Sequence, residues 1–260
     1  MRTLTRRLAA PVLASSLALT GLAAPTAFAS PAPAMKNDPR LVPLTGTKNT
    51  RTFATYRTVD GASITPRVLR SDNLASLTDR DRAKLAARGI ATIIDLRTLP
   101  ERALQPDRRP ARSRGYDVDI FGASLAQNAD LDSAYRFFVT DAGARAGFAR
   151  ALRLVSTTLG HNRAALFHCT SGKDRTGWTA ALLLTIAGVD RATVERDYLA
   201  SNKFRQTTPN SGIEGVRIGW LRESITTATS RYGSIEGYVH RGLGLSDGEI
   251  ATLRNRLRAG

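Results

Sequence analysis

Short apolar runs alternate along the chain with longer segments in which apolar residues recur every three or four positions. The short runs are rich in Val, Ile, Leu and Phe, and they predict strands at 51–59, 66–71, 90–97, 116–121 and 164–168. The longer segments predict helices at 83–87, 131–139, 144–159, 175–187, 191–199, 213–228, 234–240 and 247–257. Strands separated by helices favour an α/β fold, with a central, mostly parallel sheet of roughly four to five strands flanked by helices.

Polar residues mark where several of these elements begin and end. Thr78 with Asp81, and Ser246 with Glu249, have the spacing of capping boxes and predict helix starts. The segment 100–115 contains three prolines and several arginines, which favours an exposed loop.

The first 29 residues have the pattern of a secretory signal peptide. Three arginines are followed by an apolar run over 8–24, and Ala27-Phe28-Ala29 fits a cleavage site after Ala29. Two prolines argue against a stable membrane anchor, and both Sec and twin-arginine export stay open. We therefore expect a secreted protein with a signal peptide at 1–29, a linker or flexible arm at 30–50 and one folded domain at 51–260.

The composition indicates the charge of the ligand but not its identity. The chain has 260 residues and a formal net charge of +16, so it suits an anionic substrate. Its arginines are scattered and no nucleic-acid-binding motif is recognisable, so a nucleic-acid partner is not expected. The single cysteine has no partner for an internal disulfide. In an exported protein it is kept either for chemistry or for packing.

That cysteine stands where a buried strand meets a helix. Cys169 follows the strand at 164–168, and Arg175 stands six positions later, where the helix begins. Loop amides and the first amides of a helix bind anions, and a helix N-terminus with a nearby guanidinium lowers a thiol pKa. Gly172 permits a backbone conformation that other residues avoid, and Thr176 has a hydroxyl that can reach the sulfur. The pattern predicts a phosphate-binding loop with a nucleophilic thiolate.

The string from His168 to Gly177 resembles the signature of the cysteine-dependent tyrosine phosphatases. It is most similar to the secreted bacterial PtpB-like branch. The resemblance implies a tyrosine-phosphatase-like catalytic domain that hydrolyses phosphotyrosine with broad specificity and uses neither metal nor cofactor. Phosphoinositides or inositol polyphosphates are alternative substrates. A non-catalytic module that binds phosphorylated ligands is the alternative from another class.

The resemblance also assigns roles to individual residues. Those expected to act in catalysis are Cys169, Arg175, Asp174 and Thr176. Substrate is expected to contact the loop residues Thr170, Ser171, Gly172, Lys173, Asp174 and Arg175, with Lys173 at the rim of the site. Supporting roles are expected for His168, Asp95 and Arg97. For Asp95 and Arg97 the alternative is an ion pair that joins strand and loop.

The sequence offers alternatives for the general acid and for a lid over the site. Asp174 matches the acid of the PtpB-like branch, while Asp95 or a residue not located in the sequence is the alternative. By analogy with the family, residues 123–147 form a lid over the site. Two ordinary packing helices explain the same segment equally well.

Overall fold

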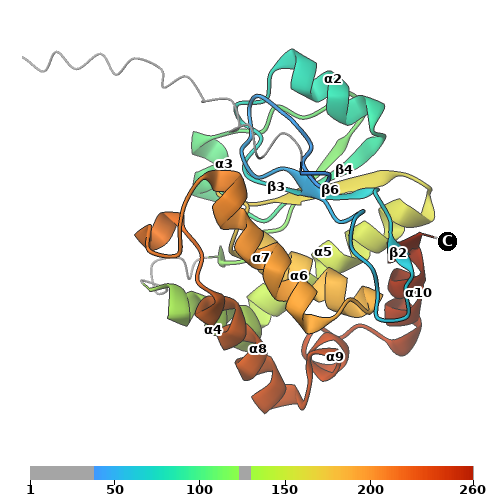
Figure 1. Ribbon diagram of the computed structural model, residues 1–260, viewed down its shortest axis with the longest axis vertical. Helices are drawn as coiled ribbons and strands as arrows, with labels where there is room; N and C mark the ends of the chain where they lie inside the picture. Colours follow the sequence, from blue (N-terminus) through green and yellow to red (C-terminus); the bar gives the residue numbers. More distant parts are fainter. Residues whose placement is uncertain (1–37, 123–129, 260) are drawn as a thin grey trace, which may run out of the picture.

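The computed structural model describes residues 38–122 and 130–259. Its centre is a five-stranded sheet in the order β1-β3-β6-β4-β5 (Figure 1). The strands are β1 (Arg51–Thr52), β3 (Val68–Ser71), β6 (Ala164–His168), β4 (Ile90–Asp95) and β5 (Arg114–Asp117). All neighbours pair in parallel except β1, which runs antiparallel to β3. The predicted α/β class and mostly parallel sheet are confirmed.

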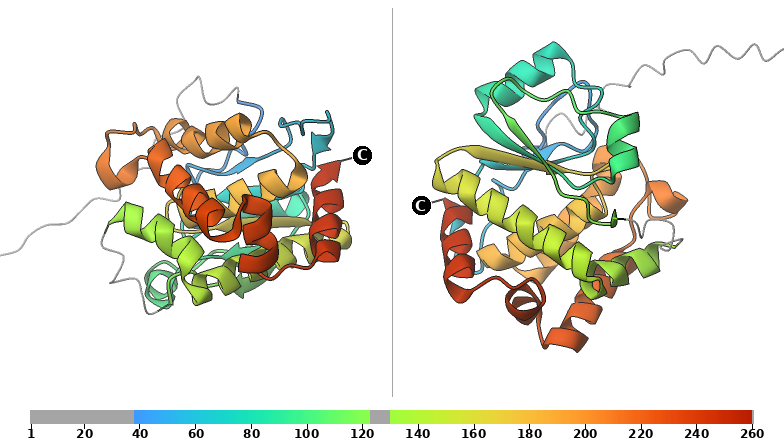
Figure 2. Two further views of the ribbon diagram at one scale, coloured as in Figure 1. Left: turned by 90° about the horizontal axis from the view of Figure 1, so that it is seen from below. Right: turned by 180° about the vertical axis from the view of Figure 1, so that it is seen from behind.

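Helices cover both faces of this sheet. Figures 1 and 2 show α2 on one side and α5 and α6 on the other. The helices are α2 (Asp79–Ala87), α3 (Leu99–Leu104), α4 (Leu131–Thr140), α5 (Ala142–Gly160), α6 (Arg175–Ala187), α7 (Arg191–Arg205), α8 (Ile218–Tyr232), α9 (Ile235–Gly237) and α10 (Asp247–Leu257). Short turns of helix lie at η2 (Gly212–Glu214) and η3 (Tyr238–Gly242), and β2 (Ser63–Ile64) pairs with β7 (Arg258–Ala259). Among the described residues, no helix has the length and apolarity needed to cross a membrane.

The central strand β6 is apolar at consecutive positions because it is buried on both faces. Ala165 and Phe167 belong to the large hydrophobic cluster shared with α5 and α6. Ala164 and Leu166 belong to a smaller cluster on the other face, which includes Leu85 of α2. Side chains alternate between the two faces of a strand, so both faces of β6 must be apolar. The strand is therefore fixed between two cores, and its carboxyl end is a firm base for the loop that follows.

The N-terminal boundary differs from the prediction. Residues 1–29, the predicted signal peptide, lie outside the described residues. The arm expected at 30–50 is wrong for its described part, because Val42 and Leu44 are buried in the smaller core and Asn49 is fully enclosed. Apolar residues here are too few and too irregularly spaced to predict an element, but they are enough to dock an extended segment.

The proline-rich segment 100–115 also differs from the expected loop. It begins with the helix α3, which Thr98 and Glu101 start with a capping box. Strand β5 lies at Arg114–Asp117, two residues before the predicted start. After β5 the chain stays extended, and the predicted alternation of buried and exposed side chains continues there, with Val118 and Ile120 buried. An alternating pattern indicates an extended backbone, but a strand also needs a neighbouring strand to pair with. The neighbour of β5, β4, ends at Asp95, opposite Asp117, so among the described residues 118–121 have no strand to pair with there.

Two further boundaries were set too wide. Of the strand predicted at 51–59 only Arg51–Thr52 pairs in the sheet, and the helix predicted from residue 213 begins at Ile218. The helices predicted at 131–139, 144–159 and 175–187, and both capping boxes, are confirmed.

Candidate active site

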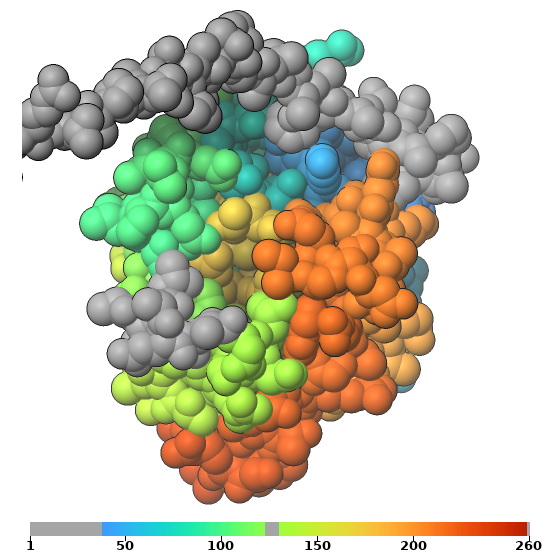
Figure 3. All heavy atoms as spheres, turned by 90° about the vertical axis from the view of Figure 1, so that its left-hand side faces the viewer, coloured from blue at the N-terminus to red at the C-terminus, as the bar shows by residue number. Residues whose placement is uncertain are grey.

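The connection from β6 to α6 forms the floor of a hollow in the surface. Figure 3 shows this segment in gold, between walls formed by the green α3 region, the lime α4 and the orange segment after α7. Cys169 is a free cysteine, buried directly after β6. Gly172 has φ of +67°, and a Cβ there would lie 2.5 Å from the Ser71 carbonyl oxygen. Glycine is therefore required at this turn.

Three carbonyl groups of this loop, those of Thr170, Ser171 and Gly172, are turned toward the surrounding chain. Donors from four distant residues hold them there. The backbone and side-chain amides of Asn73 donate to the Thr170 carbonyl oxygen. The Asn49 side chain donates to the carbonyl oxygens of both Ser171 and Gly172. Arg205 also donates to Ser171 and Arg70 to Gly172, and all these distances are 2.8–3.2 Å. The C=O and N–H of a trans peptide point in opposite directions. The amides of Ser171, Gly172 and Lys173 therefore point inward, as an anion site requires.

A buried ion-pair cluster anchors one of those donors, Arg70. Asp197 of α7 accepts hydrogen bonds from Arg51 and Arg70, and all three side chains are almost fully enclosed. Burial alone would raise the pKa of Asp197, but the two guanidinium groups lower it to about 2. The Arg70 guanidinium thus joins this ionised carboxylate to the Gly172 carbonyl, 2.8 Å away.

The Cys169 thiol is more acidic than an ordinary cysteine. Burial alone would raise its pKa, but the Arg175 guanidinium and the hydroxyl and amide of Thr176 outweigh burial and lower the pKa. The Thr176 hydroxyl is buried and makes no standard hydrogen bond to another described group. It is therefore free to interact with the sulfur. The predicted cluster of Cys169, Arg175 and Thr176 is brought together.

Arg175 is held by a residue that is not among the catalytic, substrate-binding or supporting residues expected from the sequence. Glu101 of α3 accepts two hydrogen bonds of 2.7 Å, one from each terminal nitrogen of the Arg175 guanidinium. Glu101 also accepts a hydrogen bond from the Thr170 hydroxyl, and the guanidinium lies 5.0 Å from the centre of the Phe121 ring. Burial alone would raise the pKa of Glu101, but Arg175 lowers it well below its usual range. Two signals in the sequence point to this position: Glu101 lies four residues after Arg97, and Thr98 with Glu101 has the spacing of a capping box that starts α3.

Asp95 and Arg97 form a buried ion pair behind the loop. Arg97 also bonds to Asp107. His168 donates from Nε2 to Asp107 at 2.9 Å, and its Nδ1 lies 3.3 Å from the Cys169 oxygen. Burial alone would lower the pKa of His168, but Asp107 raises it above its ordinary value. The group supports the loop from below. With both carboxylate oxygens of Asp95 bonded to Arg97, the structure does not favour Asp95 as a general acid.

The same group is also the place where a metal would be considered. The ligand atoms of Asp95, Asp107 and His168 lie within 4.8 Å of one another. One terminal nitrogen of Arg97 already bonds to both carboxylates, at 2.7 Å each. A metal ion would have to displace this guanidinium, so the residues present do not fit a metal site.

Lys173 and Asp174 contact α4 and α8, because Asp174 bonds to Tyr135 of α4 and the Lys173 ammonium lies over the Trp220 ring of α8. Lys173 was expected at the rim but is only 3% exposed, and its ammonium pairs with Asp174 at 2.9 Å. The Tyr135 hydroxyl donates to the same carboxylate at 2.9 Å. Of the possible lid, residues 123–129 lie outside the described residues. The described part includes α4, which packs with Tyr135 and Phe138 in the core and forms a wall of the hollow.

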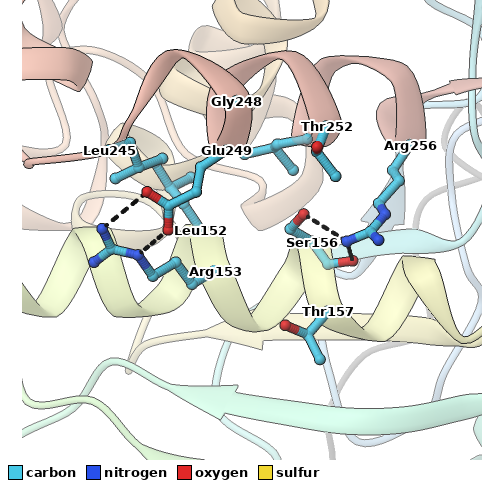
Figure 4. A pocket seen from close by; sticks show the side chains of 10 residues that line it. Leu152, Arg153, Ser156, Thr157, Leu245, Gly248, Glu249, Thr252 and Arg256 are labelled. Atoms are coloured by element: carbon cyan, nitrogen blue, oxygen red, sulfur yellow. Dashed lines mark hydrogen bonds and ion pairs between the residues drawn. The ribbon is translucent and has the colours of Figure 1, made fainter.

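A second pocket, of about 340 Å³, lies between α5 and α10, away from the loop. Figure 4 shows it bounded by an ion pair of Arg153 with Glu249 at 2.7 Å and a hydrogen bond from Arg256 to Ser156. Ordinary interhelical contacts account for these groups, so the loop is the stronger candidate site.

Comparison of the sequence with known proteins leads to the same kind of site. Residues 42–259 match the tyrosine phosphatase family. The chain belongs to the tyrosine phosphatase family. It is 31% identical to the tyrosine-protein phosphatase of Nostoc commune, over 73% of each chain. It is 29% identical to the triple specificity protein phosphatase PtpB of Mycobacterium tuberculosis, over 74% of this chain and 90% of that one.

Among solved structures, TpbA of P. aeruginosa matches 74% of this chain and 87% of its own, with 16% identity and a TM-score of 0.38. The sequence relatives are the stronger comparison. The predicted PtpB-like, cysteine-dependent phosphatase is confirmed, and so is enzyme activity as a protein-tyrosine phosphatase acting on a phosphorylated substrate.

Proposed function

We propose that this tyrosine phosphatase is a secreted enzyme that hydrolyses phosphate monoesters through a cysteinyl-phosphate intermediate. Its main substrate is phosphotyrosine in proteins, and its specificity is broad. The observation that carries the proposal is geometric: Cys169 directly precedes a loop whose Thr170, Ser171 and Gly172 carbonyl groups are bonded from outside, which turns the loop amides toward the hollow. The neighbouring Arg175 and Thr176 lower the pKa of the Cys169 thiol. A thiolate is the nucleophilic form of cysteine, and the amides suit the equatorial oxygens of a phosphoryl group.

The reaction has two displacements at phosphorus. In the first, the Cys169 sulfur forms a bond to phosphorus while the bond to the leaving oxygen breaks, and Asp174 gives that oxygen a proton. In the second, water attacks phosphorus, the ionised Asp174 accepts a proton, and the bond to sulfur breaks to release inorganic phosphate. The Thr176 hydroxyl stabilises the departing sulfur. Glu101 occupies the outer edge of the Arg175 guanidinium, which leaves its Nε edge for two phosphoryl oxygens.

The alternatives receive less support from the site. Phosphoinositide or inositol polyphosphate hydrolysis is favoured by the positive net charge and, through the family resemblance, by Lys173. In the structure this lysine is buried and paired with Asp174, which leaves the net charge as the remaining support. A module that only binds phosphorylated ligands has no need of a thiol with a lowered pKa. The name of the M. tuberculosis relative, with its triple specificity, favours a broad substrate range for this chain as well.

Two measurements test the enzyme proposal. Hydrolysis of p-nitrophenyl phosphate in EDTA should proceed with the wild-type protein and be abolished by Cys169→Ser, which keeps the size of the side chain. Phosphate release from a panel of phosphotyrosine, phosphoserine and phosphothreonine peptides and phosphoinositides then ranks the substrates. A phosphoinositide that exceeds every phosphopeptide in kcat/KM would contradict the phosphotyrosine assignment.

Secretion is tested separately on the full chain. After expression in a bacterial host with intact export, the mature protein should be recovered outside the cytoplasm, with its N-terminus at Ser30. Retention in the cytoplasm with residues 1–29 attached would contradict this part of the proposal.

A further inference from the structure

The Asp174 carboxylate lies between two neighbours of different character. Lys173 contacts both of its oxygens, at 3.0 and 2.9 Å. The Tyr135 hydroxyl contacts only Oδ1, at 2.9 Å, and lies 2.7 Å from the hydroxyl of Tyr198. Lys173 therefore does not distinguish the two oxygens, whereas Tyr135 does.

The Tyr135 ring is fixed from several sides. It is fully buried, stacks on Trp220 with ring centres 6.4 Å apart, and meets the Tyr198 ring edge-on at 89°. Ser224 of α8 donates a hydrogen bond of 2.6 Å to its backbone oxygen, which joins α4 to α8 at this residue. A hydroxyl on such a ring has little freedom to leave Asp174.

Gly177 in α6 allows Tyr198 to stand so close. A Cβ at this position would lie 3.0 Å from the Tyr198 ring, closer than ordinary van der Waals contact. The glycine that follows Thr176 in the loop signature thus makes room for the second tyrosine. The loop, α4 and α7 meet through these two hydroxyl groups.

The two contacts of Asp174 respond differently to its protonation. Burial raises the pKa of Tyr135 and of Tyr198 well above the ordinary value, so both phenols keep their protons. A phenol donates to Oδ1 whether Asp174 is ionised or carries a proton on Oδ2. The Lys173 ammonium favours only the ionised form. The phenol contact is therefore the one that can persist while Asp174 gives up and regains a proton.

We propose that Tyr135, supported by Tyr198, is a positioning residue for Asp174. It holds the carboxyl group by Oδ1, so that Oδ2 faces the leaving oxygen. This inference depends on the proposed role of Asp174 as general acid.

The test compares substrates that need the acid to different degrees. Phenyl phosphate has a basic leaving group and needs a proton from the enzyme, whereas 4-nitrophenyl phosphate has a much better leaving group and needs it less. The ratio of their kcat/KM values reports acid delivery, because kcat/KM covers the steps up to departure of the leaving group. Tyr135→Phe should lower kcat/KM about tenfold for phenyl phosphate and about twofold or less for 4-nitrophenyl phosphate.

Three further variants separate the possible explanations. Asp174→Asn should change the ratio in the same direction and more strongly, by about a hundredfold. Tyr198→Phe should give a smaller change than Tyr135→Phe, and it decides the question should Tyr135→Phe fail to fold. Tyr238→Phe is the matched control: it removes a buried hydroxyl that donates to the Phe138 carbonyl, away from the loop, and should leave the ratio unchanged.

Each outcome is decisive. An altered ratio in Tyr135→Phe, or in Tyr198→Phe when the first variant does not fold, supports the inference. Equal losses on both substrates would show a merely structural role and overturn it, as would unchanged activity. An unchanged ratio in Asp174→Asn would instead overturn the proposed general acid, and the inference with it.

Discussion

Asp197→Asn should strongly destabilise this phosphatase, although the residue lies outside the catalytic loop. The side chain is 1% exposed and is the shared counter-ion of Arg51 and Arg70, both fully buried. The substitution keeps the shape of the side chain and removes its charge. Two enclosed guanidinium groups then face each other without a counter-ion, and Arg70 also holds the loop at Gly172.

The pKa of Asp197 sets a lower bound on the loss of stability. Burial alone would raise the pKa of Asp197, but its two arginine partners lower it to about 2, against about 3.9 in an unfolded chain. At about 1.4 kcal/mol per unit, ionisation stabilises the fold by roughly 2–3 kcal/mol at neutral pH. This contribution is complete above about pH 4 and is lost as the pH falls toward about 2. Leaving buried charges unpaired typically costs about 3–5 kcal/mol, which is the loss we expect for Asp197→Asn.

Urea unfolding at neutral pH measures this loss as a lower midpoint with an unchanged slope. Glu223→Gln is the control, because its ion pair with Arg136 is exposed and should contribute little. The wild type should also lose more stability than Asp197→Asn between about pH 4 and pH 2. A variant that unfolds at the wild-type urea concentration would refute the argument that this cluster anchors the loop.

Other predictions concern the loop itself. Alkylation of Cys169 by iodoacetate should rise with pH around a midpoint below that of free cysteine, and a midpoint equal to that of free cysteine would remove the basis of the mechanism. Gly172→Ala should reduce kcat/KM by about a hundredfold or more, since its φ of +67° and the nearby backbone exclude a Cβ; wild-type kinetics would contradict this. Glu101→Gln removes half of the clamp on Arg175 and should raise KM for 4-nitrophenyl phosphate by about tenfold; an unchanged or lower KM would show that Glu101 merely competes with substrate.

The parts of the fold that depend on local pattern could be predicted. The two-faced burial of β6 produces a continuous apolar run, and the helices with capping boxes begin where their caps indicate. The predictions failed where tertiary contact decides. Val42 and Leu44 form no periodic pattern and become ordered only by docking on the smaller core. Helix α3 is short and exposed, and the prolines and arginines of the segment 100–115 that contains it are typical of a loop.

The candidate site also has a part that the sequence predicts and a part that only tertiary contacts determine. Cys169, Gly172 and Arg175 lie within one contiguous string, so spacing alone could place them in one loop. The groups that hold this loop come from distant positions. Asn49 is more than a hundred residues from the carbonyl groups it binds, and Glu101 reaches Arg175 from a different helix. No periodicity connects such pairs, because only the folded sheet brings them together.

This division has a physical consequence for the mechanism. A string of loop residues can supply the thiol, the guanidinium and the amides, but an anion site needs its amides already turned inward before the ligand arrives. In this phosphatase the inward orientation is enforced from outside, by donors that hold the opposing carbonyl groups of 170–172. Since Arg70 is itself fixed by Asp197, the geometry of the loop depends on a buried charge that never meets substrate. Transfer of the signature string alone to another strand–loop–helix unit should therefore reproduce the sequence of the site without its preorganised amides.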